Sequence, residues 1–159
     1  MSDPGRTAIR AGHVVAFDGG AHRLLRDGVV VVEGGVVVHV GHRFDGPADR
    51  TVEAPTDVLT PGFVSTHAHI HASPLDRSFI EDTGTPQFFY SGLFEMLPVR
   101  SGAQDDAATA ACIDFSMAEL LRGGTTTVLE IGLPDERVVA AAARFGLRVY
   151  LGCAFRSGR

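Results

Sequence analysis

The chain has 159 residues, of which 45% are hydrophobic and 21% charged, a composition typical of one ordinary globular domain or two small ones. Its formal net charge of −5 at pH 7, without a basic stripe, argues against nucleic acid or an acidic membrane surface as a partner. The basic residues are all arginine, which excludes Schiff-base chemistry on a lysine.

The N-terminal part of the sequence predicts β-strands. Ala8–Asp18 is expected to form a first strand, ended by two glycines. Two valine-rich runs, Gly28–Glu33 and Val36–Gly41, are separated by a second pair of glycines at 34–35. This is a strong hairpin signal, because a two-residue turn of the primed type needs positive φ angles that glycine adopts freely.

We therefore expect a small β-sandwich lobe, or one half of it, over residues 1–57. Its last part, Asp45–Asp57, is rich in Asp, Pro and Ala and is predicted to be a linker.

The run from Val58 to Ile70 predicts a buried strand that ends with His67 and His69. Side chains two residues apart on a strand share one face, so the two imidazoles could hold a divalent ion together. Such a pair also arises by chance, and a catalytic zinc site usually has at least three protein ligands. Its place at the C-terminal end of the run, where the catalytic residues of a (β/α) barrel lie, favours the metal interpretation.

A long segment without a clear helical or strand period follows, His71–Arg100. Connections of this length usually have a function. Its aromatic side chains are expected either to cover a planar substrate or to pin the loop to the core. The polar residues Arg77, Gln87 and Glu95 are candidates for orienting a substrate.

The rest of the sequence alternates between helix and strand patterns. The capping-box form of Ser101–Gln104 predicts the start of a helix, whose apolar face would hold Ala108, Ala111, Cys112, Phe115 and Ala118. Three elements are expected next. They are a β-branched strand over Thr125–Ile131, a helix that is opened by Pro134, capped by Gly146 and carries Val138, Val139, Ala142 and Ala143, and a last strand over Leu147–Phe155. This order predicts a parallel sheet.

Two further residues are candidates for supporting the histidine pair. His71 would share the face of His67 and His69 if the strand continued, and would then face the substrate or support the metal ligands; otherwise it is an ordinary loop histidine. Glu130, at the end of the predicted strand 125–131, would point toward the catalytic mouth and support the ligands rather than bind the metal itself.

The segment PGFVSTHAH (61–69), preceded by a β-rich lobe with the turn EGG (33–35) and followed by MAELLRGGTTTVLE (117–130), resembles the N-terminal part of the metal-dependent amidohydrolase superfamily. Within it, the branch of aromatic deaminases and chlorohydrolases is the most similar. The resemblance covers almost all of the chain. It implies an α/β fold, in which residues 58–159 form the first three strands and two helices of an incomplete (β/α)8 TIM-like barrel.

A barrel of this kind needs about 250 residues, so the resemblance implies that five strands lie outside this chain. A third histidine, the general base and the metal-binding Asp are expected beyond residue 159. They would be encoded in the same gene or on another polypeptide.

The resemblance implies a hydrolase acting on carbon–nitrogen bonds other than peptide bonds, through a metal-activated water. The favoured reaction is deamination, or dechlorination, of a small planar heterocycle. Alternatives are hydrolysis of an amide or cyclic amide, and a catalytically silent fragment. One divalent ion, zinc first and iron or manganese as alternatives, would take His67 and His69 as two of its ligands. A non-enzymatic binding lobe leaves the histidine pair unexplained.

The expected partners are a small-molecule substrate and the missing barrel strands, with self-association into a homo-oligomer as an open alternative. Apolar runs fall short of the ~18 residues that span a bilayer, and the N-terminus has no signal-peptide pattern. Cys112 and Cys153 lack metal-site spacing and lie in apolar patterns, which favours buried free thiols. These features predict a cytoplasmic protein without nucleic-acid or membrane partners.

Overall fold

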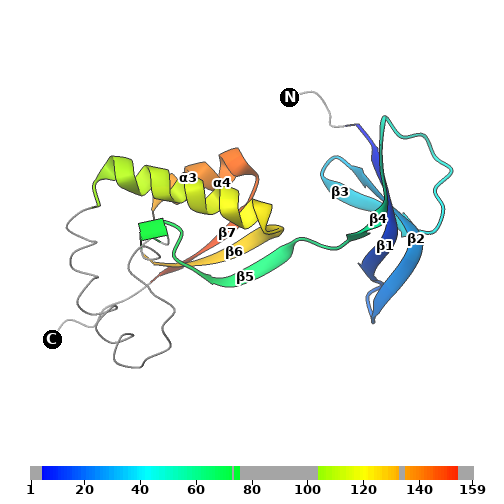
Figure 1. Cartoon of the computed structure of the whole chain (residues 1–159), viewed down its shortest axis with the longest axis horizontal. Coiled ribbons are helices and arrows are strands. Elements are labelled where there is room, and N and C mark those ends of the chain that lie inside the picture. Colours follow the sequence, from blue (N-terminus) through cyan, green and yellow to red (C-terminus); the bar gives the residue numbers. More distant parts are fainter. Residues whose placement is uncertain (1–4, 73, 76–103, 133–134, 154–159) are drawn as a thin grey trace. The chain divides into compact units, whose positions relative to one another are not determined.

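The computed structural model describes residues 5–72, 74–75, 104–132 and 135–153. The chain divides into two units, Met1–Pro61 and Gly62–Arg159, and Figure 1 shows their elements in chain order.

The first unit is a four-stranded sheet with the order β3-β2-β1-β4. Its strands are β1 (Thr7–Phe17), β2 (His22–Glu33), β3 (Val36–Gly41) and β4 (Arg50–Leu59). β1 pairs antiparallel with β2 and parallel with β4, and β2 pairs antiparallel with β3. Ala8, Val29 and Val31 form its buried cluster, against which Phe44 packs.

The glycine hairpin is confirmed. Glu33 pairs with Val36 across a two-residue turn, in which Gly34 and Gly35 have φ angles of 58° and 79°. Both values lie in the left-handed region that a side chain disfavours. β2 begins earlier than predicted, at His22.

The predicted linker Asp45–Asp57 is wrong over its second half, because residues 50–59 form β4. Val52 and Ala54 are partly buried and alternate with exposed Thr51 and Glu53, the two-residue period of a strand. Pro55 indicated a break in the sequence, but β4 is an edge strand, where proline is tolerated.

This unit contributes one sheet to the predicted sandwich. The described residues of this unit form one sheet, so the second layer of the sandwich stays a prediction.

The second unit contains a parallel sheet with the order β5-β6-β7. Its strands are β5 (Phe63–Ala68), β6 (Thr125–Gly132) and β7 (Arg148–Cys153), and its helices are α3 (Asp106–Arg122) and α4 (Glu136–Phe145). Both helices lie over the same face of the sheet in Figure 1, and the core between the layers includes Ile113 and Met117 of α3, Val128 of β6 and Val138 of α4.

The predicted strand, helix, strand, helix, strand order is therefore confirmed. It fits the N-terminal portion of a TIM-barrel enzyme. Closure into eight strands stays a prediction.

Helix α3 differs from its prediction in two respects. Its N-cap is Asp105, whose Oδ1 accepts a hydrogen bond of 2.7 Å from the Ala108 amide, and Ser101 of the predicted capping box lies outside the described residues. Its buried face carries Thr109, Cys112, Ile113, Ser116 and Met117, whereas Phe115 of the predicted face is 56% exposed. In α4, Val138 and Ala142 are buried as predicted, while Val139 and Ala143 are exposed.

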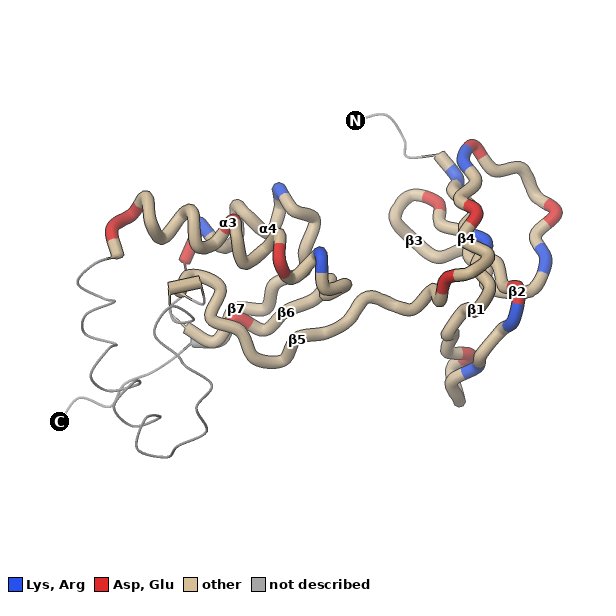
Figure 2. The backbone as a smooth tube through the Cα atoms, in the orientation of Figure 1, with Lys and Arg blue, Asp and Glu red and all other residues tan. Residues whose placement is uncertain are grey.

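The prediction of one buried strand from Val58 to Ile70 is also wrong. The run contains the end of β4, a break at residues 60–62, and β5. Phe63 and Val64 are 58% and 64% exposed, because β5 is an edge strand of its sheet and no described element covers these side chains. Figure 2 shows that β5 carries no charged residue.

Candidate functional site

The candidate site lies where β5 ends. His67 is the penultimate residue of this strand, and His69 is the first residue after it. Their Nε2 atoms are 3.2 Å apart, and the rings meet edge to face with their centroids 5.1 Å apart. Both residues are exposed. The structure therefore brings the two predicted imidazoles together at the carboxyl end of the first strand of a parallel sheet.

The backbone around His67 departs from a regular ladder. The register between β5 and β6 shifts between Ser65, which pairs with Val128, and Ala68, which pairs with Glu130. Three steps along β5 thus oppose two along β6, the count of a β-bulge. Bulges occur next to active sites, where they re-aim a side chain, and this one contains His67.

The spacing of the two nitrogens fits a tetrahedral metal site. Two imidazole ligands at the usual zinc–nitrogen distance of 2.0–2.1 Å are about 3.3 Å apart in that geometry, close to the 3.2 Å between the Nε2 atoms. Imidazole is a suitable ligand for zinc and iron, as it is for copper and nickel. Within the described ranges, no group of three or more His, Cys, Asp or Glu side chains could hold a metal ion, so this pair would need ligands from elsewhere.

Glu130 and His71, the two residues predicted to support the histidine pair, contact each other. Glu130 is 1% exposed; its Oε2 accepts a hydrogen bond of 2.6 Å from the Ile70 amide, and its Oε1 is 3.0 Å from Nδ1 of His71. A carboxylate can only accept, so an ionised Glu130 requires the proton on Nδ1 of His71. The contact joins two residues that the sequence singled out separately.

Gln104 is a contact that the sequence did not predict. Its Nε2 donates a 2.6 Å hydrogen bond to the carbonyl of His71. The sequence presented Gln104 only as the last residue of a capping box, and a contact across 33 positions gives no periodic signal. His71 is thereby held at its backbone by Gln104 and at its ring by Glu130.

Three predicted site residues lie outside the described residues: Arg77, Gln87 and Glu95. The same holds for the aromatic residues of the predicted substrate loop.

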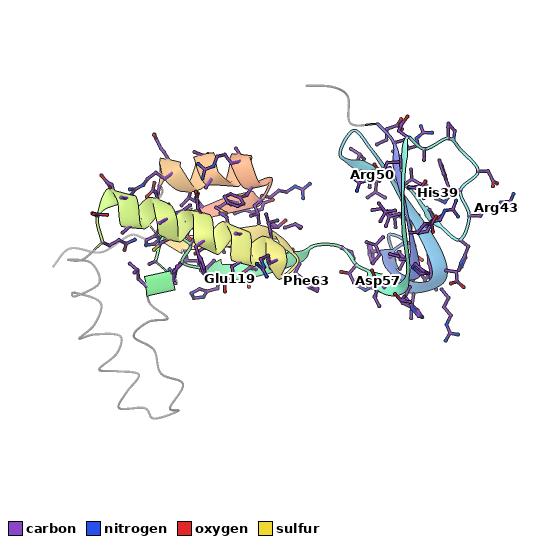
Figure 3. The ribbon with its side chains drawn as sticks, turned by 45° about the horizontal axis from the view of Figure 1, so that its top comes forward. His39, Arg43, Arg50, Asp57, Phe63 and Glu119 are labelled. Atoms are coloured by element: carbon purple, nitrogen blue, oxygen red, sulfur yellow. The ribbon has the colours of Figure 1, made fainter. Side chains whose placement is uncertain are left out.

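A cavity of about 410 Å³ lies beside β5. Ser65 and His67 line it from the strand, and Ser116 and Glu119 line it from α3; Figure 3 labels Glu119 and, on β5, Phe63. His67 therefore borders open space on the α3 side of the strand.

None of the helices in the described part of the chain is long and apolar enough to cross a membrane.

Comparison with known sequences gives the family. The amidohydrolase family model matches residues 58–157. A 5-methylthioadenosine/S-adenosylhomocysteine deaminase from Symbiobacterium thermophilum is 31% identical over 150 residues, which cover 90% of this chain and 32% of the relative. An imidazolonepropionase from Salinispora arenicola is 34% identical over 118 residues, which cover 70% of this chain and 30% of that protein. The chain thus spans about a third of the length of these curated relatives.

Solved structures agree with this result. An adenosine deaminase from Xanthomonas campestris with bound zinc has a TM-score of 0.76 at 30% identity, over 90% of this chain and 32% of that one. An atrazine chlorohydrolase from Arthrobacter aurescens, also with zinc, has a TM-score of 0.72 at 21% identity over 92% and 35%, a likeness of fold alone. Because the family model matches most of the chain, including β5 and the two histidines at its end, the chain belongs to the amidohydrolase family.

Proposed function

We propose that this chain supplies the first part of the active site of a metal-dependent hydrolase that acts on carbon–nitrogen bonds other than peptide bonds. The observation that carries the proposal is the 3.2 Å approach of the His67 and His69 Nε2 atoms at the end of β5. That end of a parallel strand is where (β/α) barrels place their catalytic groups.

His67 and His69 would hold two positions of one divalent ion, with zinc as the first candidate and iron or manganese as alternatives. When bound, such an ion supplies an activated water for attack on an electrophilic carbon. The other ligands and the general base are expected beyond residue 159. The protein residues described here would fix the two imidazoles, and the cavity beside His67 leaves that side chain accessible.

The proposed reaction is deamination of a small planar heterocycle of the adenine type. Relatives named as deaminases of 5-methylthioadenosine or 5′-deoxyadenosine support this substrate class, at 31% and 28% identity, as does the zinc-bound adenosine deaminase. Water would add to the ring carbon that bears the amino group, and ammonia would leave. Dechlorination has weaker support, because the chlorohydrolase likeness concerns only the fold.

Hydrolysis of a cyclic amide is a second candidate. Imidazolonepropionases from Salinispora arenicola and Streptomyces coelicolor are 34% and 36% identical to this chain over their matched segments. This reaction also breaks a carbon–nitrogen bond, but it opens a ring and releases no ammonia. Product analysis therefore separates the two candidates.

Metal analysis tests the site in the protein encoded by the longest open reading frame that contains these residues, because the other ligands are expected beyond residue 159. We expect this wild-type protein to bind zinc in a competition titration and the variant carrying both His67→Ala and His69→Ala to lose it. His22→Ala is the control, because His22 is an exposed residue of β2 in the other unit. Equal zinc binding by the wild type and the double variant would contradict the role of the pair.

Activity should be assayed in the protein encoded by the longest open reading frame that contains these residues. We expect ammonia release from adenosine derivatives, and its loss in either single histidine variant by more than about 100-fold, the upper range for residues that merely support a metal ligand. A ring-opened product without ammonia would favour the second candidate. Zinc binding without turnover of either substrate class would support the silent alternative.

A further inference from the structure

Glu130 is a buried carboxylate whose two oxygens are both used. It is 1% exposed, and burying a charge is costly unless hydrogen bonds compensate. Its partners are the amide of Ile70, at 2.6 Å, and the His71 ring, at 3.0 Å. These are the two residues that directly follow His69. The carboxylate therefore hydrogen-bonds the chain immediately after the candidate metal ligands.

The ladder between β5 and β6 does not hold this segment. The last paired residues are Ala68 and Glu130, and His69 lies one residue beyond them. The register is already irregular between Ser65 and Ala68, around His67. After Ala68 the backbone turns, with the Ala72 amide donating to the His69 carbonyl at 3.1 Å. Glu130 thus links β6 to the chain beyond the ladder.

We propose that Glu130 is a positioning residue for the metal pair: its carboxylate fixes the turn at residues 69–72 and thereby holds the His69 ring against His67. Gln104 supports the same turn through the carbonyl of His71, at 2.6 Å. The effect on metal binding rests on the proposed function, whereas the effect on the turn does not. The two parts can therefore be tested separately.

The first test is independent of metal. Glu130→Ala removes both acceptors, so amide exchange at Ile70 should become roughly 10-fold faster or more, as expected for loss of a hydrogen bond to a charged group. Glu130→Gln keeps the shape but offers an amide N–H₂ to His71. Nitrogen NMR of the imidazole should then show the His71 proton moving from Nδ1 to Nε2.

The second test is the zinc affinity of the protein encoded by the longest open reading frame that contains these residues. Residues that support a metal ligand typically contribute 10- to 100-fold to affinity, and we expect a loss in this range for Glu130→Gln and Glu130→Asp. Aspartate keeps the charge but is one methylene too short for both partners. Glu136→Gln, an exposed glutamate in the first turn of α4, is the matched control and should bind zinc like the wild type.

The outcomes separate the proposals. Faster Ile70 exchange together with weaker zinc binding, in variants whose thermal unfolding shows that they remain folded at the assay temperature, supports Glu130 as a positioning residue. Unchanged zinc affinity in folded Glu130→Gln and Glu130→Asp overturns it. If the wild-type protein that includes the residues beyond 159 binds no zinc, the metal site fails, and unchanged Ile70 exchange in Glu130→Ala would overturn the fixed turn as well.

Discussion

Gly132 shows how tightly the residues behind the histidine pair are packed. A Cβ atom at this position would lie 2.9 Å from Oε1 of Glu130 and 3.0 Å from Cε1 of His71. Both atoms belong to the contact that holds the turn after His69. A side chain at 132 must therefore displace the carboxylate or the imidazole.

We predict that Gly132→Ala destabilises the chain by about 1–3 kcal/mol, the usual cost of overpacking, and also accelerates amide exchange at Ile70. Gly123→Ala is the control, because a Cβ there meets backbone oxygens at an ordinary 3.5 Å. Urea unfolding and hydrogen exchange measure the two effects. A Gly132→Ala variant as stable as Gly123→Ala would contradict the packing.

Asp135 makes the stability of the second unit depend on pH. It is the N-cap of α4 and accepts from the Arg137 amide at 2.8 Å, while the Arg137 guanidinium binds both of its oxygens. The hydrogen bond from Arg137 is the main cause that lowers the pKa of Asp135 below its ordinary value. A lowered pKa means that the stabilisation is complete above the unfolded pKa and is lost as the pH falls through the folded one.

We therefore predict that Asp135→Asn loses stability relative to the wild type at pH 7, and that this difference shrinks from about pH 4 downward, where an unfolded aspartate takes up its proton. Asp135→Ala should cost about 1 kcal/mol at pH 7 for the lost cap. Thermal unfolding across the pH range measures both, with Asp57→Asn on β4 as the control. A difference that does not change with pH would refute the assignment.

At the scale of the elements, the buried face of α3 decides the stability of the second unit. Met117 is fully buried in the core between helices and sheet, whereas Phe115, two positions earlier, is 56% exposed. We predict that Met117→Ala costs about 2–5 kcal/mol and that Phe115→Ala changes stability by less than about 1 kcal/mol. Urea unfolding measures the loss of stability in both variants. A similar loss in the two would mean that the buried face of α3 is assigned incorrectly.

The same helix shows where sequence reasoning was insufficient. Apolar residues occur on more than one side of α3, so the spacing from Ala108 to Ala118 and the spacing from Thr109 to Met117 both fit a helical period. The period predicts the helix, but only the sheet beneath it selects the face. That choice depends on contacts with β6 and α4, which are distant in the sequence.

The strands show the same difference between local and long-range signals. The hairpin at 34–35 was predictable because its signal is local: two glycines supply the positive φ angles that the turn needs. β4 was not, because its pairing with β1 joins residues about 40 positions apart, and Pro55 suggested a loop. The site divides in the same way, since the two-residue spacing predicts the histidine pair, whereas the Gln104 bond to His71 exists only after the chain folds.

At the scale of the whole molecule, the two units have separate buried clusters. One contains Ala8, Val29 and Val31, and the other surrounds Met117 and Val128. The chain spans about a third of the length of its relatives, and several of its large apolar side chains are exposed at sheet edges. The folded units therefore present apolar edges whose behaviour in solution can be measured.

The edge strand β5 is the site at which we expect self-association. It lies at one end of the order β5-β6-β7, carries no charge (Figure 2), and exposes Val64 to 64%. An uncharged apolar edge with free backbone groups is a template for pairing with another chain, and a charge on it blocks such pairing. We predict that the purified wild type associates as its concentration rises and that Val64→Glu reduces this.

Sedimentation velocity over a concentration series measures the association. Val139→Glu is the matched control, because Val139 is similarly exposed, at 52%, but lies on α4, where the helical backbone bonds are internal. Association that falls in Val64→Glu and persists in Val139→Glu assigns it to the edge of β5. Equal reduction in both variants would mean that added negative charge, rather than a blocked strand edge, keeps the chains apart.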